Sequence, residues 1–196
     1  MQIDNCRLKI AERVPVYILA GGRSRRFGSD KARALLQGKP LILHVAEALR
    51  PFASSITAVA DTAGKYDDFG LRTIADLRPG LGPLGGLASA LAHCGESWLL
   101  LTACDLPGIA QPWIETLLSA NRDTRQVVAF RSDRWQPMPA LYHQSITALV
   151  GEQIQRDRLA FQCLLDRASS AAQPLPHDWP ATAGVNTPQE LEGFAV

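Results

Sequence analysis

The chain of 196 residues is long enough to form one domain with a substantial hydrophobic core. A hydrophobic fraction of 46% and a charged fraction of 20% are ordinary for a globular protein and exclude a disordered or fibrous chain. Lys and Arg number 20 and Asp and Glu 19, so the net charge of +1 does not support a whole-protein attraction to nucleic acid or to anionic lipid.

The first 13 residues carry charges throughout and contain no apolar run of the kind found in signal peptides. We therefore treat residues 1–13 as an N-terminal extension without an assigned role and residues 14–196 as one domain. No apolar run approaches the roughly 18 residues that a membrane span needs. The four cysteines form no C-x-x-C pair, which predicts reduced thiols and no zinc knuckle. These features predict a soluble protein of the cytoplasm.

Short apolar, β-branched runs alternate with amphipathic segments through the first 120 residues. This alternation predicts βαβ units, and hence an α/β fold with a mostly parallel central sheet and helices on both faces. The expected strands, in chain order, are Val14–Leu19, Ser55–Ala60, Leu71–Ala75, Trp98–Thr102, Gln126–Phe130 and Pro139–His143.

The expected helices follow from apolar spacing and from capping residues. Leu41, Val45 and Leu49 place one apolar stripe on a helix that begins at Pro40. The expected helical segments are a turn from Asp30 to Leu36, then Pro40–Arg50, a helix from Pro83 to about His93, one around 114–118, Leu159–Arg167 and Pro188–Phe194.

Three loops follow predicted strands and should meet at one edge of the sheet, namely Ala20–Asp30, Asp76–Gly86 and Ala103–Pro107. Ligands of open parallel sheets bind beyond the carboxyl ends of the strands. We therefore expect the chemistry of this protein to lie in these loops.

The first loop joins a glycine pair, Gly21-Gly22, to several basic residues, among them Arg26 and Lys31. Glycines let backbone N–H groups approach a ligand closely, and guanidinium groups match phosphate oxygens, so the loop suits a polyphosphate. The alternative is a solvated basic loop. The segment Gly38-Lys39 is not a P-loop, because Pro40 stands where Ser or Thr is required.

The second loop contains Gly80-Leu81-Gly82-Pro83-Leu84-Gly85, which has the G-x-G-x-x-G spacing. It does not follow its strand directly and no acidic residue lies at the usual distance, so it is a weak dinucleotide fingerprint. A loop that packs against a flat ligand and opens a helix at Pro83 explains it better. Asp76, which also follows an apolar strand, is a candidate carboxylate or an acceptor for a sugar hydroxyl.

In the third loop, Asp105 comes directly after an apolar strand and before Leu106-Pro107. A carboxylate at this edge is well placed to hold Mg²⁺, which takes one or two carboxylates and completes its shell with substrate phosphates. The alternative is that Asp105 only caps the turn before Pro107. The four histidines have no metal-ligand spacing and no neighbouring nucleophile.

The three loops, in this order, resemble a nucleotidyltransferase family, the one that contains the molybdenum cofactor guanylyltransferases. Leu19–Lys31 (LAGGRSRRFGSDK) resembles the opening signature of the family, with Phe27 in place of the commoner Met. The similar segments that follow are Gly38–Leu41, Gly82–Gly86, Cys104–Pro107 and Val185–Pro188. The resemblance implies a Rossmann-like nucleotidyltransferase fold over about residues 14 to 194.

The resemblance also implies roles for individual residues. The loop formed by Leu19, Ala20, Gly21 and Gly22 would hold the guanine and ribose, with Asp76 near the nucleotide. Arg26 and Lys31 would contact the triphosphate, and Asp105 would bind Mg²⁺, so that Lys31, Arg26 and Asp105 form the expected catalytic set. Gly82 and Asn186 would lie on the side that receives molybdopterin.

The implied reaction transfers GMP from GTP to molybdopterin carrying molybdenum, and yields the guanine dinucleotide and pyrophosphate. Mg²⁺ is the implied cofactor, GTP and molybdopterin are the substrates, and transient docking to molybdoenzymes or other cofactor-synthesis proteins is an expected interaction. Neither nucleic acid nor a membrane is an expected partner.

Several alternatives stay open. The related cytidylyl enzymes tend to have Ala-Gly where this chain has Gly21-Gly22, which favours GTP over CTP. A sugar-phosphate or phospholactate nucleotidyltransferase of the same fold is a further candidate. A non-catalytic nucleotide-binding module is another, although Lys31 and Asp105 are both present. A nucleic-acid-binding protein that uses the arginine cluster is disfavoured by the net charge.

Overall fold

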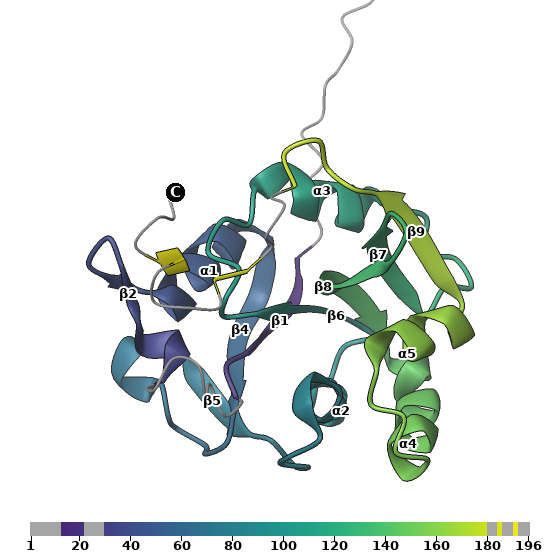
Figure 1. Cartoon of the computed structure of the whole chain (residues 1–196), viewed down its shortest axis with the longest axis horizontal. Coiled ribbons are helices and arrows are strands. Elements are labelled where there is room, and N and C mark those ends of the chain that lie inside the picture. Colours follow the sequence, from purple (N-terminus) through teal and green to yellow (C-terminus); the bar gives the residue numbers. More distant parts are fainter. Residues whose placement is uncertain (1–12, 22–29, 180–183, 186–189, 192–196) are drawn as a thin grey trace, which may run out of the picture.

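A computed structural model describes residues 13–21, 30–179, 184–185 and 190–191. Its centre is a seven-stranded sheet with the order β5-β4-β1-β6-β8-β7-β9 (Figure 1). Among these seven strands β8 runs antiparallel to its neighbours β6 and β7, and the other pairings are parallel. The strands are β1 (Val14–Leu19), β4 (Ala53–Ala60), β5 (Arg72–Ala75), β6 (Trp98–Ala103), β7 (Val127–Arg131), β8 (Trp135–His143) and β9 (Ser170–Pro174).

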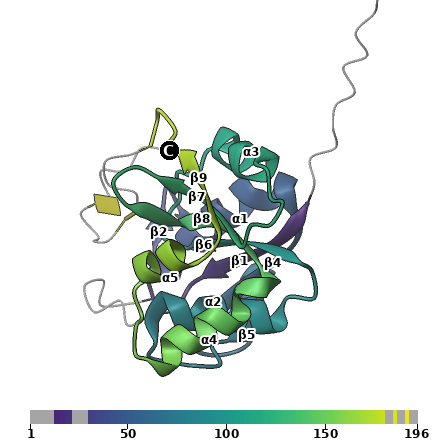
Figure 2. The same ribbon diagram turned by 90° about the vertical axis from the view of Figure 1, so that its right-hand side faces the viewer.

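Helices cover both faces of this sheet (Figure 2). Residues of α1 and α3 pack on one face, and residues of α2, α4 and α5 pack on the other. The predicted mostly parallel sheet with helices on both faces is therefore confirmed. The helices are α1 (Leu41–Leu49), α2 (Gly82–His93), α3 (Gln111–Ser119), α4 (Thr147–Gln155) and α5 (Phe161–Arg167).

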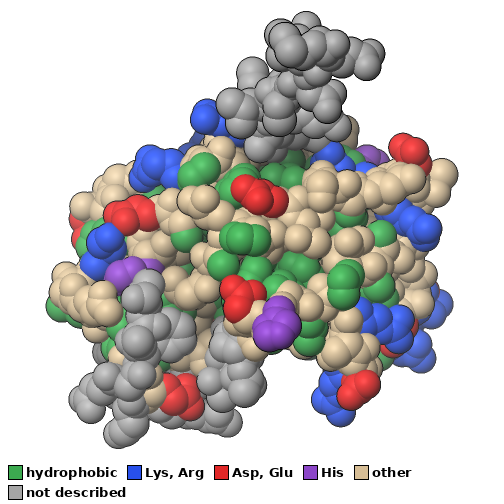
Figure 3. All heavy atoms as spheres, turned by 90° about the horizontal axis from the view of Figure 1, so that it is seen from above, with side chains coloured by type: hydrophobic (Ala, Val, Ile, Leu, Met, Phe, Trp, Pro, Cys, Tyr) green, Lys and Arg blue, Asp and Glu red, His purple; other side chains and the backbone are tan. Residues whose placement is uncertain are grey.

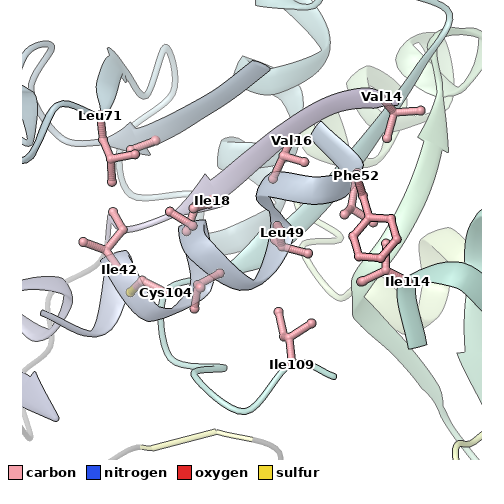
Figure 4. Packing of buried hydrophobic residues seen from close by; sticks show 14 of the residues in the cluster. Val14, Val16, Ile18, Ile42, Leu49, Phe52, Leu71, Cys104, Ile109 and Ile114 are labelled. Atoms are coloured by element: carbon pink, nitrogen blue, oxygen red, sulfur yellow. The ribbon is translucent and has the colours of Figure 1, made fainter. Parts of the chain in front are cut away.

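Strand β1 lies between these two layers and is buried along its whole length. Its side chains alternate between the faces, as the two-residue period of a strand requires. Val16 and Ile18 join the cluster beneath α1, where Ile42 and Leu49 meet them (Figure 4). Leu19 points to the other face and joins the cluster under α2. A strand buried on both faces explains the unbroken apolar run of the sequence.

The segment after Asp30 differs from the prediction. The helical turn expected through Leu36 ends early, as a 3₁₀ helix η1 (Lys31–Arg33). The chain then forms a small hairpin of β2 (Leu35–Leu36) and β3 (Lys39–Pro40). Gln37 and Gly38 have φ angles of 51° and 79° in the turn of this hairpin, a backbone conformation that suits glycine at position 38.

Two elements of the C-terminal half were not predicted. The helix α4 contains Gly151 and only two buried residues, Val150 and Gln153, so its apolar pattern is weak. The strand β9 has the sequence SAAQP and pairs with β7 at the edge of the sheet. It lacks the β-branched residues that signal a strand. The helix expected over Pro188–Phe194 falls largely outside the described residues.

The described part of the chain contains no helix with the length and apolar character that a membrane span requires. On the surface shown in Figure 3, which is seen from the α3 side, acidic and basic side chains are interspersed. The described residues of this face therefore form no broad region of one charge sign.

Candidate functional site

The connections around β1 create a crevice at one edge of the sheet. Strand β1 has β4 on one side and β6 on the other, so the strand order reverses between β1 and β6. Ligands of open α/β sheets bind at such switch points, beyond the carboxyl ends of the strands. The Cys104 N–H donates to the Leu19 carbonyl oxygen at 3.0 Å and joins the loops that leave these two strands.

A cavity of about 260 Å³ occupies this crevice, and it is bordered by all three loops of the sequence analysis. Residues at the ends of β1, β4 and β6 line it together with residues of α2. The lining residues are Leu19, Ala20, Gly21, Asp30, Lys31, Val59, Lys65, Asp76, Gly82, Pro83, Gly86, Ala103, Cys104, Asp105 and Met138.

Lys31 and Asp105 form an ion pair at this cavity. The Lys31 ammonium lies 2.7 Å from Asp105 Oδ2, and the two side chains are 13% and 28% exposed. Lys31 opens η1, whose first turn is capped by the Asp30 carboxylate, which accepts the Ala32 N–H at 3.1 Å. Residues 74 positions apart in the sequence thus place opposite charges together at the strand ends.

The backbone of Asp105 is held by the C-terminal segment. The Val185 N–H donates to the Asp105 carbonyl oxygen at 3.0 Å. A Cβ atom at Gly184 would lie only 3.2 Å from the same oxygen, so this approach suits glycine. The segment Val185–Pro188, which resembles a family motif, therefore begins beside the Asp105 turn, although Asn186 lies outside the described residues.

Asp76 also lines the cavity, and hydrogen bonds fix its carboxylate there. Its Oδ1 accepts the Arg78 N–H at 2.9 Å and the Ser89 hydroxyl at 2.8 Å, while the Leu77 N–H donates to the same hydroxyl. A Cβ atom at Gly85 would stand 2.9 Å from the Arg78 carbonyl oxygen. Gly85 therefore allows α2 to approach the Asp76 loop closely, which adds a structural role to the ligand-packing role expected for this glycine loop.

The cavity contains a thiol that is not available for acid–base chemistry. Burial is the main cause that raises the pKa of the Cys104 thiol to about 12, and the neighbouring Asp105 carboxylate contributes to the same shift. The thiol is therefore protonated at neutral pH, and the thiolate, which is the nucleophilic form, is scarce. Within the described part of the chain, no histidine lines the cavity.

Most residues expected at the site from the sequence are brought together. Leu19, Ala20, Gly21, Lys31, Asp76, Gly82 and Asp105 all line the one cavity. Gly82 was expected on the acceptor side, and it borders the same cavity as the nucleotide residues. Gly22, Arg26 and Asn186 lie outside the described residues, so their roles stay predictions.

Lys65 was missed by the sequence analysis. It lines the cavity, and its ammonium lies 2.8 Å from Asp61 Oδ1 and 3.3 Å from Asp30 Oδ2. Burial lowers the pKa of Lys65, but hydrogen bonds to these two carboxylates outweigh burial and raise it overall. The segment between the second and third predicted strands, residues 61–70, contains two glycines and four charged residues, but they match none of the motifs used in the sequence analysis. Met138, also on the cavity wall, gave no signal either.

The donor set at Asp105 fits Mg²⁺ but not a metal enclosed by protein ligands. Within the described ranges no group of three or more His, Cys, Asp or Glu side chains could hold an ion. Mg²⁺ retains waters and is usually bound by one or two carboxylates together with substrate phosphates. A single partly exposed carboxylate at a cavity satisfies that requirement.

The fold and this crevice define a nucleotidyltransferase of the Rossmann-like class. The chain belongs to the family described as "MobA-like NTP transferase domain", which matches residues 16–171. This confirms the family resemblance that the sequence motifs indicated.

The chain is similar to a "Probable molybdenum cofactor guanylyltransferase" of Deinococcus radiodurans, with 44% identity over 131 residues, 66% of this chain and 67% of the relative. A "Molybdenum cofactor guanylyltransferase" of Photobacterium profundum is 32% identical over 192 residues and covers 94% of this chain and 96% of its own. The solved structure of "Molybdopterin-guanine dinucleotide biosynthesis protein A" from Archaeoglobus fulgidus has a TM-score of 0.77 at 24% identity, over 92% of this chain and 96% of that one.

Proposed function

We propose that this nucleotidyltransferase transfers GMP from GTP to molybdopterin that carries molybdenum, with release of pyrophosphate. The names of the similar proteins from Photobacterium and Deinococcus support the substrates. The observation that carries the site assignment is the Lys31–Asp105 pair at 2.7 Å on a cavity that is bordered by the three loops of the sequence analysis.

The proposed reaction requires that the charge of the phosphates is neutralised and that the reacting groups are aligned, but it requires no proton abstraction. The attacking group is a phosphate monoester, which is already anionic near neutral pH, so no general base is needed. Among the described residues that line the cavity there is no histidine, and the Cys104 thiol stays protonated. The attack would be in line on the α-phosphate, with pyrophosphate leaving on the opposite side.

Lys31 is the residue that we assign to the phosphates. Its ammonium reaches the cavity from η1 and is fixed there by its contact with Asp105. In the reaction it would offset charge that develops on the α-phosphate and on departing pyrophosphate. Arg26 is proposed to act beside it, as the family resemblance implies.

Asp105 is the residue that we assign to Mg²⁺. When bound, the cation would draw charge from phosphate oxygens and orient the nucleotide. Asp105 itself holds its carboxylate at the cavity through a backbone that is fixed by Cys104 and by the Val185 N–H. Its contact with Lys31 keeps the two charged groups at the place where the triphosphate would lie.

The remaining site residues are assigned either to the nucleotide or to the acceptor. Leu19, Ala20 and Gly21, together with Gly22, are proposed to hold the guanosine, and Asp76 to lie near it. Gly82 and Asn186 are proposed for the pterin side. We keep residues 14–196 as one nucleotidyltransferase domain in which the N-terminal half binds the nucleotide and the C-terminal half contributes the acceptor side. Docking to molybdoenzymes or other cofactor-synthesis proteins remains part of this proposal.

Incubation of the purified protein with GTP, Mg²⁺ and a source of molybdopterin tests the proposal. Pyrophosphate and the guanine dinucleotide should appear together in equal amounts. Replacement of GTP by CTP should abolish both products. Efficient product formation from CTP would instead make the protein a cytidylyltransferase, and pyrophosphate release with a sugar phosphate or phospholactate would assign another acceptor.

A further inference from the structure

Tyr66 is a fully buried tyrosine in the connection between β4 and β5. Its hydroxyl lies 3.1 Å from the Ala20 carbonyl oxygen and 3.1 Å from each carboxylate oxygen of Asp30. All three neighbouring atoms are acceptors, so the single phenol proton is shared between the Ala20 carbonyl oxygen and the Asp30 carboxylate. Burial, followed by the Asp30 carboxylate, raises the pKa of Tyr66 far above its usual value, so the donor proton is retained.

The two partners of this hydroxyl come from the two sides of the first loop. Ala20 directly follows β1 and precedes the glycine pair, whereas Asp30 directly precedes Lys31. One side chain from a different segment therefore contacts both. The rest of Tyr66 is also fixed, because its N–H donates to Thr73 Oγ1 and its carbonyl oxygen accepts the Phe69 N–H.

Asp30 transmits this contact to Lys31. The same carboxylate that accepts from Tyr66 caps η1 through the Ala32 N–H and pairs with the Lys65 ammonium at 3.3 Å. Lys31 is the first residue of η1, and its ammonium reaches Asp105. The direction of the Lys31 side chain thus depends on a carboxylate that is held from the β4–β5 connection.

Arg33 fastens the other end of η1 to the same connection. Its guanidinium donates to the Lys65 carbonyl oxygen at 2.6 Å and to the Asp68 carboxylate at 2.7 Å, and it lies 4.6 Å from the ring centre of Phe69. Both ends of η1 therefore rest on residues 65–69, and the start of the helix depends on Tyr66 and Lys65.

We infer that Tyr66 is a positioning residue of the transferase reaction. Its hydroxyl fixes the positions of Ala20 and Asp30 relative to each other, and thereby orients the Lys31 side chain toward Asp105. This inference rests on the proposed function, in which Lys31 acts on the phosphates. It assigns to the β4–β5 connection a role in the reaction that the sequence motifs do not include. A displacement of a reacting group by about 1 Å can lower the rate roughly a hundredfold.

The test compares Tyr66→Phe with Tyr17→Phe in the full chain. Tyr17 is the control because it is also buried and its hydroxyl contacts His93 Nδ1 at 2.7 Å, and neither residue lines the cavity. The first measurement is the extent to which each lysine is acetylated by a limiting amount of an amine-reactive reagent, as determined by mass spectrometry. The chain has four lysines, so Lys31 is measured against Lys39, whose side chain is 40% exposed.

Tyr66→Phe should raise the labelling of Lys31 several-fold relative to Lys39, whereas Tyr17→Phe should leave the ratio unchanged. The second measurement is steady-state kinetics with GTP. Tyr66→Phe should lower kcat roughly tenfold or more, with a smaller change in KM, because the misplaced ammonium acts mainly on the transition state. Tyr17→Phe should retain the kcat of the wild type.

Unchanged Lys31 labelling in Tyr66→Phe overturns the inference, even if kcat falls, because the effect would not pass through Lys31. A rise in labelling with unchanged kcat overturns it as well. If Tyr66→Phe does not fold, Lys65→Met, which removes the ammonium 3.3 Å from Asp30 Oδ2 at a partly exposed position, must raise Lys31 labelling. If the wild type transfers no GMP, the proposed function fails, and the labelling result alone decides whether Tyr66 sets Lys31.

Discussion

The Cys104 N–H and the Leu19 carbonyl oxygen are joined by a hydrogen bond of 3.0 Å at the point where β1 and β6 both end. The loop that begins at Ala20 and the turn that carries Asp105 therefore start from one rigid junction. This explains how Lys31 and Asp105, which are far apart in sequence, meet at 2.7 Å.

Removal of either member of the charged pair should remove most of the activity and leave the fold intact. Loss of one such electrostatic contact costs on the order of 3 kcal/mol, or about a hundredfold or more in rate. Lys31→Ala and Asp105→Ala should therefore show a kcat/KM for GTP that is lower by this factor. Near-normal turnover in either purified variant would remove that residue from the mechanism. Circular dichroism and thermal unfolding check that the variants are folded.

A methyl group at Gly85 should weaken nucleotide binding, because its Cβ would stand 2.9 Å from the Arg78 carbonyl oxygen and displace the loop that carries Asp76. Gly85→Ala should lower Tm and reduce the protection that GTP with Mg²⁺ gives in thermal unfolding. Gly151→Ala is the matched control, since a Cβ there meets nothing within 4 Å and the residue lies inside α4. That substitution should stabilise the protein by about 0.5–1 kcal/mol. Equal behaviour of the two variants would contradict the steric argument.

Truncation of the core beneath α1 should be costly. Leu49 is fully buried in the cluster that joins α1 to β1, and Leu49→Ala should lower the free energy of unfolding by about 2–5 kcal/mol. Leu35 is 59% exposed, and Leu35→Ala should change it by no more than about 0.5 kcal/mol. Urea unfolding measures both values. A similar loss in the two variants would show that the packing around Leu49 is not as described.

The Asp61–Lys65 pair should contribute stability that depends on pH. The hydrogen bond from Lys65 holds the pKa of Asp61 below its ordinary value of 3.8. A carboxylate with a lowered pKa stabilises the folded state above its ordinary pKa, and this contribution is lost as the pH falls through the folded value. The difference in unfolding free energy between the wild type and Asp61→Asn should therefore be present near neutral pH and vanish in acid. A difference that grows on acidification would reverse the assigned sign.

The parts of the fold and site that could be predicted are those encoded by local pattern. The apolar run of β1 and the stripe of α1 lie where expected, because burial on two faces and on one face leave distinct periodicities. The edge strand β9 was missed, since its small side chains and its pairing with β7 are set by tertiary contacts. Likewise Lys31 and Asp105 could be predicted as site residues because they lie in recognisable motifs, whereas Tyr66 and Lys65 could not. Their importance arises from contacts with Ala20 and Asp30 across more than 30 positions of sequence.

The hydrogen bond from the Val185 N–H to the Asp105 carbonyl oxygen has a consequence for biosynthesis. A nascent chain that has emerged only as far as α5 already holds every strand around the cavity, yet the backbone of Asp105 still lacks this partner. This contact can form only after residue 185 has left the ribosome, later than the synthesis of the strands that surround the cavity.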